Sequence, residues 1–231
     1  MSWSSSLIRT TSTSVPAPLS RRGRRPASRS RTASVPRRRR RVRRHPARRD
    51  GPAAGGRAAA AAAVLGVHDV RFLRHPDGRL TPSIELRRDI SREIRRFRPE
   101  RVLAQSPEIL WRRLGASHPD HRAAGEAAVA AVYPDARNPF AHPELLADEG
   151  LDAWTVPELW LMAAPEERVD HAVDVTDTVG YKIAALREHR SQTAHIDDLD
   201  TRIRSWAGAT AERFGWNDGR LAEGFQVVLI G

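Results

Sequence analysis

An amphipathic helix is the clearest periodic signal in this 231-residue chain. Its apolar positions recur at spacings of four, four and three residues, which places them on one face of a helix. A capping residue and an early proline stand at Thr81–Glu85, and Pro99 ends the run near Arg98. We therefore predict a helix between these points, with one face in a core. The apolar positions are Leu86, Ile90, Ile94 and Phe97.

Short apolar or alternating runs predict five strands. They are Val67–Leu73, Arg101–Ala104, Val156–Met162, Val169–Val175 and Phe225–Ile230. Alanine content and helical spacing predict further helices. These segments are Ala58–Leu65, His121–Tyr133 and Thr178–His189. Strands alternating with helices favour an α/β fold, in which a Rossmann-like, mostly parallel sheet has helices on both faces. In such sheets, functional residues gather in loops at the carboxyl ends of the strands.

Charge is divided unevenly along the chain. Residues 1–57 hold 17 arginines and one acid, Asp50, for a net charge of +16, so the total of +11 leaves −5 on residues 58–231. The first segment is rich in Arg, Ser and Pro and has little to bury, so we expect it to be disordered. We therefore divide the chain into a tail, residues 1–57, and a domain, residues 58–231.

Three interpretations of the tail are open. A basic arm could bind nucleic acid through phosphates, although the tail has a single aromatic residue, Trp3, and no base-reading module. An Arg- and Ser-rich, acid-poor composition is also typical of a transit peptide. The third interpretation, which we favour, is translation in a shifted reading frame.

Two absences narrow the class of protein. The chain has no cysteine, which excludes disulfide bonds and thiolate metal ligands and is typical of a cytoplasmic protein. No apolar run approaches the roughly 18 residues of a membrane span. We therefore expect a cytoplasmic protein with no membrane-spanning segment.

The sharpest chemical signal is His118-Pro119-Asp120-His121. A neutral imidazole is a common zinc ligand, a second histidine can donate to a developing oxyanion, and a carboxylate can orient an imidazole. The four residues precede a predicted helix, in a loop that follows a predicted strand, where the chemistry of such folds collects. The alternative is that Asp120 or His118 only caps the helix.

The segments around this motif resemble, in order, the PIG-L/LmbE family of zinc-dependent de-N-acetylases, in its actinobacterial type. The resemblance covers nearly all of residues 58–231. It implies an LmbE-like fold and removal of an acetyl group from an N-acetylglucosaminyl conjugate or related amide, with mycothiol-type conjugates as one substrate class. The similar segments are RFLRHPDGRL (71–80), RRDISREIRRFRPERVL (87–103), HPDHRAAGEAAVAAVYPDARNP (118–139), HPELL (142–146), EGLDAWTVPELWL (149–161) and VDVTDTVGYKIAALREHRSQT (173–193).

The resemblance also implies roles for individual residues. His121 would be a zinc ligand, His118 would stabilise the oxyanion, and Asp120 would hold His118. Asp77, in a Pro-Asp-Gly turn, could contact sugar hydroxyls. An element of the K…H-x-S-Q type lies near the site in this family and would contribute to substrate binding. It consists here of Lys182, His189, Ser191 and Gln192.

One part of the family pattern is missing. The family's first metal-binding motif, A-H-P-D-D, supplies two further zinc ligands and the general base, and the chain as written does not contain it. The strand that leads into that motif would be missing with it. The resemblance therefore implies a zinc-dependent hydrolase that is impaired or inactive as translated.

A shifted reading frame restores this motif. If suitable codons for Ser6–Ala17 (SLIRTTSTSVPA) are read from the third base of the first codon, they give A-H-P-D-D-V-D-F-G-A-G. Once a codon family is chosen for each Leu, Arg and Ser, only the wobble bases are free, since the observed residues set the other bases of every shifted codon. Lys182 is the single lysine among 39 basic residues, which indicates a GC-rich gene where shifted frames stay open. We therefore interpret residues 1–57 as frameshifted.

Other interpretations stay open. His75-Pro76-Asp77 could replace the missing motif, but Gly78 stands where a second aspartate is needed. The chain could be a non-catalytic remnant, or a nucleic-acid-binding protein that uses its basic tail. We expect the partner to be a small-molecule amino-sugar conjugate rather than nucleic acid or a membrane.

Overall fold

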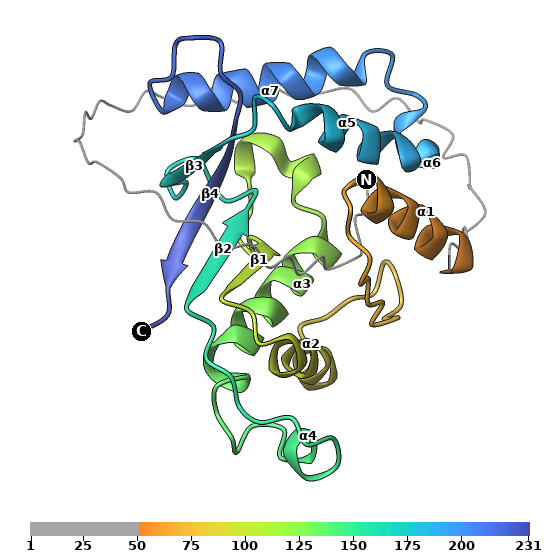
Figure 1. Cartoon of the computed structure of the whole chain (residues 1–231), viewed down its shortest axis with the longest axis vertical. Coiled ribbons are helices and arrows are strands. Elements are labelled where there is room, and N and C mark those ends of the chain that lie inside the picture. Colours follow the sequence, from red (N-terminus) through yellow and green to blue (C-terminus); the bar gives the residue numbers. More distant parts are fainter. Residues whose placement is uncertain (1–50) are drawn as a thin grey trace, which may run out of the picture.

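The computed structural model describes residues 51–231, with side chains from residue 55 onward, and its centre is a four-stranded sheet (Figure 1). The strands are β1 (Arg101–Gln105), β2 (Glu158–Met162), β3 (His171–Asp174) and β4 (Ala222–Leu229), in the order β1-β2-β4-β3. β1 and β2 are parallel, whereas β4 is antiparallel to both of its neighbours. Three strands therefore run in one direction and β4 runs between them in the other.

Helices flank this sheet, so the α/β class predicted from the sequence is confirmed. α2 and α3 pack on each other, α3 packs on β1, and α7 packs on β4. α1 lies against α5, and α6 follows α5 directly in the chain (Figure 1). None of the helices from residue 51 onward is long and apolar enough to cross a membrane. The helices are α1 (Gly51–Val64), α2 (Ile84–Phe97), α3 (Pro119–Ala130), α4 (Glu144–Ala147), α5 (Val179–Glu188), α6 (Arg190–Thr193) and α7 (Leu199–Arg213).

The main core lies between α2, α3 and the first two strands. Leu86, Ile90 and Ile94 of α2 are buried there, as the helical spacing predicted. Phe97, the fourth predicted position, is more than one-third exposed at the end of the helix. The facing positions of α3 are mostly alanine, so its backbone approaches the sheet closely. Burial of these apolar side chains is the main stabilising contribution to the packing of α3 on β1. It thereby also holds the residues at the start of α3 beside β1.

Gly125 shows how close this approach is. A Cβ at this position would lie 2.2 Å from the carbonyl oxygen of Gln105, the last residue of β1. Only glycine fits at that distance, because the obstacle is backbone rather than a movable side chain. The second turn of α3 is thus held against the carboxyl end of β1.

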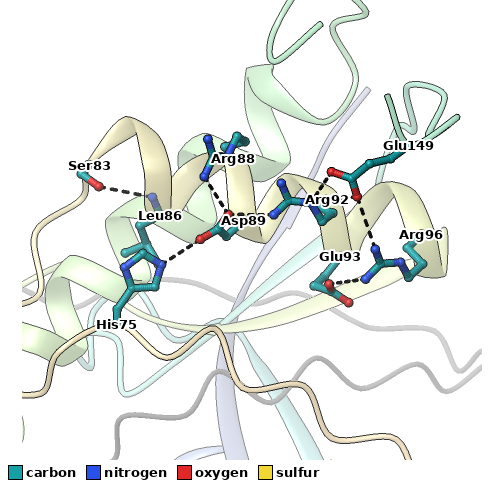
Figure 2. Close-up of polar contacts among 9 residues, drawn as sticks. All are labelled: His75, Ser83, Leu86, Arg88, Asp89, Arg92, Glu93, Arg96 and Glu149. Carbon is teal, nitrogen blue, oxygen red and sulfur yellow. Dashed lines mark hydrogen bonds and ion pairs between the residues drawn. The ribbon is translucent and has the colours of Figure 1, made fainter. Parts of the chain in front are cut away.

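α2 also has a polar face, which Figure 2 shows. Ser83 caps the helix by accepting a hydrogen bond from the N–H of Leu86, at 3.2 Å. Asp89 accepts from Arg88 and from Arg92, and Arg92 reaches on to Glu149. Such partly exposed ion pairs each contribute little to stability, typically below about 1 kcal/mol.

The predicted strand Val67–Leu73 is wrong. This segment has no regular secondary structure, although Leu73 packs against the main core. A strand needs a neighbour to pair its N–H and C=O groups, and among the described strands β1 pairs with β2 alone. The segment pairs with none of the described strands, so its alternating pattern does not form a strand.

Candidate functional site

The H-P-D-H motif lies at the start of α3. His118 is the N-cap residue, and its ring nitrogen Nδ1 accepts a hydrogen bond of 3.2 Å from the backbone N–H of Asp120. Pro119 occupies the first turn, where its missing N–H is not needed. The capping interpretation and the functional one are therefore compatible. His118 caps the helix through Nδ1, and the cap does not use its second ring nitrogen, Nε2.

This cap also assigns the proton of the His118 ring. A nitrogen that accepts a hydrogen bond carries no proton, so in the neutral ring the proton is on Nε2. His118 consequently has an N–H donor at Nε2. That atom can donate to an oxygen that gains negative charge during a reaction.

Asp120 has a different partner from the one that the resemblance implied. Its carboxylate is buried, with 3% of the residue exposed, and accepts a hydrogen bond of 2.5 Å from the backbone N–H of Gly78. Its link to His118 runs instead through its backbone N–H. Asp120 therefore fastens the Pro-Asp-Gly turn to the start of α3.

His121 lies one turn into the same helix and close to His118. The two ring centroids are 5.5 Å apart, with the ring planes tilted by 54°. Burial lowers the pKa of His121, the neighbouring His118 lowers it further, and the charges of Asp120 and Asp77 act in the opposite direction. The structure thus brings His118, Asp120 and His121 together with the turn that contains Asp77, and it favours a neutral His121.

The second predicted group lies on α5 and α6. Lys182 of α5 forms an ion pair with Glu223 of β4, and Ser191 is exposed. His189 is the C-cap of α5, and burial together with the charge of Arg57 lowers its pKa. Gln192 donates its backbone N–H to the carbonyl of His189. That this element contacts the H-P-D-H motif stays a prediction.

A zinc site can be tested against the side chains present. Among the described residues, no group of three or more His, Cys, Asp or Glu side chains is arranged to hold a metal ion. Three protein ligands are the usual minimum for catalytic zinc, so this part of the chain does not fit a complete zinc centre. The resemblance had assigned only His121 to it.

His75 does not supply the missing ligand. Its Nε2 atom lies 3.0 Å from a carboxylate oxygen of Asp89 on the polar face of α2 (Figure 2). The Pro76-Asp77-Gly78 segment forms a turn in which Gly78 has a φ of +76°, a conformation that favours glycine. His75 is therefore part of a partly exposed ion-pair cluster rather than a metal site.

Sequence reasoning missed a buried polar cluster around Asp135. Arg87 binds this carboxylate through two nitrogens, at 2.7 and 2.8 Å, and His142 lies 3.4 Å from it. Arg95 is 2% exposed and donates to four backbone carbonyls around it. The side chain of His142 is largely buried by this cluster. Because the residues of this cluster are far apart in the sequence, no local sequence pattern predicts it.

Comparisons with known proteins agree with the family resemblance. Residues 53–132 match the PIG-L family, described as GlcNAc-PI de-N-acetylase. Diacetylchitobiose deacetylase from Thermococcus kodakarensis is 31% identical over 169 residues, which are 73% of this chain and 60% of that protein. The chain therefore spans less than two thirds of the length of this relative.

Solved structures with a similar fold include a deacetylase. N,N'-diacetylchitobiose deacetylase from Pyrococcus horikoshii aligns with a TM-score of 0.65 and 29% identity, over 76% of this chain and 62% of that one. A conserved protein from Thermus thermophilus aligns at 0.59 and 25%, covering 76% and 74% of the two chains. The hydratase GalB from Pseudomonas putida aligns at 0.59 and 23%, covering 77% and 71%, and this likeness shows the fold alone.

Proposed function

Because the chain is related to the PIG-L de-N-acetylases in sequence and in fold, we propose that it carries the greater part of an amide hydrolase that removes acetyl groups from N-acetylated amino sugars. The observation that carries this proposal is the H-P-D-H motif at the start of α3, fastened to the Asp77–Gly78 turn by Asp120. Two of the relatives, one matched in sequence and one in structure, are by name deacetylases of diacetylchitobiose, a two-sugar substrate.

Each residue of the motif has a part in this proposal. His118 presents its Nε2–H to the oxygen of the acetamide as negative charge develops there. His121, kept neutral by its surroundings, offers a lone pair to a metal ion. Asp120 is a positioning residue, which fixes the turn of Asp77 beside these rings. Lys182, His189, Ser191 and Gln192 would contact the substrate from α5 and α6.

The described residues supply too few ligands for zinc. We propose that the other ligands belong to the A-H-P-D-D motif, which a shifted frame of residues 6–17 can encode. The chain as written then binds zinc weakly and lacks the aspartate of A-H-P-D-D that would activate water. It is therefore inactive in deacetylation, although its fold is that of a deacetylase.

The shifted frame has further support outside the motif. Extended back through Ser2–Ser6 with TCG as the serine codon, the same frame gives a run of valines directly before A-H-P-D-D. Such a run is typical of a buried parallel strand. In the described part of the sheet, β1 is an edge strand that pairs only with β2. The restored strand would pair with β1 and bring the missing motif to the same end of the sheet.

We propose a small N-acetylglucosaminyl conjugate or related amide as substrate, acted on in the cytoplasm; a mycothiol-type conjugate is one candidate. The second candidate function is that of a non-catalytic remnant, which the lack of a three-ligand group among residues 51–231 favours. Nucleic-acid binding by the basic tail is the weakest candidate. It requires salt-dependent binding that disappears when residues 1–57 are removed.

Two substitutions in the frame-restored protein test the assigned roles. His121→Ala should abolish zinc binding and activity together. His118→Ala should leave zinc binding intact and lower kcat by about 100-fold or more, the usual effect of removing an oxyanion donor. Zinc content and acetate release from N,N'-diacetylchitobiose are the measurements. Loss of zinc in both variants, or in neither, would contradict the assignment.

A further inference from the structure

An exposed apolar lip stands at the carboxyl end of β1. The loop from β1 to α3 contains a short helical turn, η1 (Trp111–Ala116), in which Trp111 is 79% exposed and Leu114 is 61% exposed. Large apolar side chains exposed together are uncommon on a monomer and typically mark a binding surface. We call Trp111 and Leu114 the apolar lip.

Hydrogen bonding holds the lip beside the H-P-D-H motif. The backbone N–H of Leu110 donates to Oγ of Ser117 at 2.8 Å, and Ser117 is the residue before His118. The N–H of Ser117 donates in turn to the carbonyl of Leu114. These two hydrogen bonds tie the residues on either side of the apolar lip to Ser117, which precedes the motif. The lip and the motif therefore cannot move far independently of each other.

Two exposed ion pairs show that the same loop lies beside the segment that follows β2. Arg168 lies 3.6 Å from Glu108, and Arg112 lies 3.9 Å from Glu166. Because β1 and β2 are parallel, both segments are at the carboxyl edge of the sheet. The apolar lip therefore lies at the same edge of the sheet as the H-P-D-H motif.

The chemistry of the lip favours a sugar ring. An indole offers a flat apolar face, and a pyranose has a face of C–H groups with hydroxyls at its rim. Arg112, which is next to Trp111 and largely exposed, provides N–H donors for such hydroxyls. A second copy of the chain is a poorer occupant. A twofold contact through Trp111 would place Arg112 and Arg113 of each copy near the same arginines of the other.

We propose that Trp111 is the platform for a second pyranose ring, the one joined to the N-acetylated sugar that lies at His118. This inference rests on the proposed function and extends it, because it assigns a residue of this chain to the part of the substrate beyond the N-acetylated sugar. Leu114 widens the apolar platform beneath that ring.

Calorimetric titration of the full chain with N-acetylglucosamine and with N,N'-diacetylchitobiose tests this platform. The disaccharide should bind about two- to tenfold more tightly, the range typical of one aromatic stacking contact. Trp111→Ala should remove this preference and Trp111→Phe should keep most of it. Phe140→Ala is the matched control, because Phe140 is 88% exposed but follows the far end of α3. It should leave the preference unchanged.

Several results would overturn the inference. Equal affinity for the two sugars would do so, as would a disaccharide preference that survives in Trp111→Ala. A change of oligomeric state in Trp111→Ala would assign the lip to self-association instead. Failure of the chain to bind either sugar would overturn this inference, and acetate release by the frame-restored protein then tests the proposed function separately. A preference that depends on Trp111, without acetate release by the frame-restored protein, would overturn the proposed function alone.

Discussion

The carboxylate of Asp120 accepts a hydrogen bond from the backbone N–H of Gly78, 42 residues earlier in the chain. The bond is 2.5 Å long and the carboxylate is buried. It links the start of α3 to the turn that carries Asp77, whose charge acts on His121. The geometry of the candidate site therefore depends on this contact between two distant segments.

Asp120→Ala should lower the free energy of unfolding by about 1–3 kcal/mol, because it leaves the N–H of Gly78 without its acceptor. Asp120→Asn keeps an oxygen that can accept the same bond, so it should cost less. Urea denaturation of the two variants and the parent chain measures this difference. Equal stability of all three proteins would show that the bond does not hold the turn.

Gly125→Ala should destabilise the fold by about 1–3 kcal/mol, since its Cβ would lie 2.2 Å from the carbonyl oxygen of Gln105 and α3 would have to shift. Gly180→Ala in α5 is the matched control, because no atom lies within 4 Å of a Cβ there. In a helix, that change should be neutral or stabilising by up to about 1 kcal/mol. Thermal unfolding of both variants is the measurement, and equal shifts would contradict the close packing of α3 on β1.

Asp135→Ala should cost about 2 kcal/mol of stability. Removing one partner of a fully buried ion pair typically costs roughly 3–5 kcal/mol. The cost here should be lower, because the side chain of Arg87 is about one-third exposed. Asp200→Ala, which removes the exposed partner of Arg204, should change stability by less than about 0.5 kcal/mol. Comparing the two by urea denaturation separates a buried cluster from a surface pair. Similar small effects would mean that the Asp135 cluster contributes little.

Stability should fall as the pH falls from 7.5 to 5.5. The pKa values of His121 and His189 are both lowered in the folded chain, chiefly by burial. Below the unfolded value of about 6.5, the unfolded chain therefore binds more protons than the folded one. His189→Gln should reduce this dependence. Arg57→Gln should reduce it less, because the charge of Arg57 is the second cause of the shift. A slope unchanged in His189→Gln, measured by urea denaturation at each pH, would contradict this account.

The sequence predicted those elements whose signal is local. α2 was predicted because Leu86, Ile90 and Ile94 recur at helical spacing and Ser83 caps the helix. α7 was missed because two of its buried positions, Ala207 and Ala211, are too small to give a strong periodic pattern. The segment Val67–Leu73 has a strand pattern but no described neighbour to pair with. Pairing partners are a property of the whole sheet, which a short segment cannot reveal.

The candidate site was predictable to the same extent. The H-P-D-H motif lies at a helix start, as expected, because the cap and the proline are encoded within four residues. The partner of Asp120 was not predictable, since the fold alone brings Gly78 to it. The cluster of Arg87, Asp135 and His142 is long-range in the same way. The sequence therefore predicted which residues gather at the candidate site but not the contacts that hold them.

Acetate release by two versions of the protein tests whether loss of the A-H-P-D-D motif makes the chain inactive. One is the chain as written, and the other is translated from the same gene with its frame restored, so that A-H-P-D-D precedes α1. Both are incubated with zinc and N,N'-diacetylchitobiose, and acetate is measured over time. We expect release by the frame-restored protein and none by the chain as written, because residues 51–231 do not hold a three-ligand group. Equal release by both versions would show that the chain as written already has a complete site, and would contradict this account.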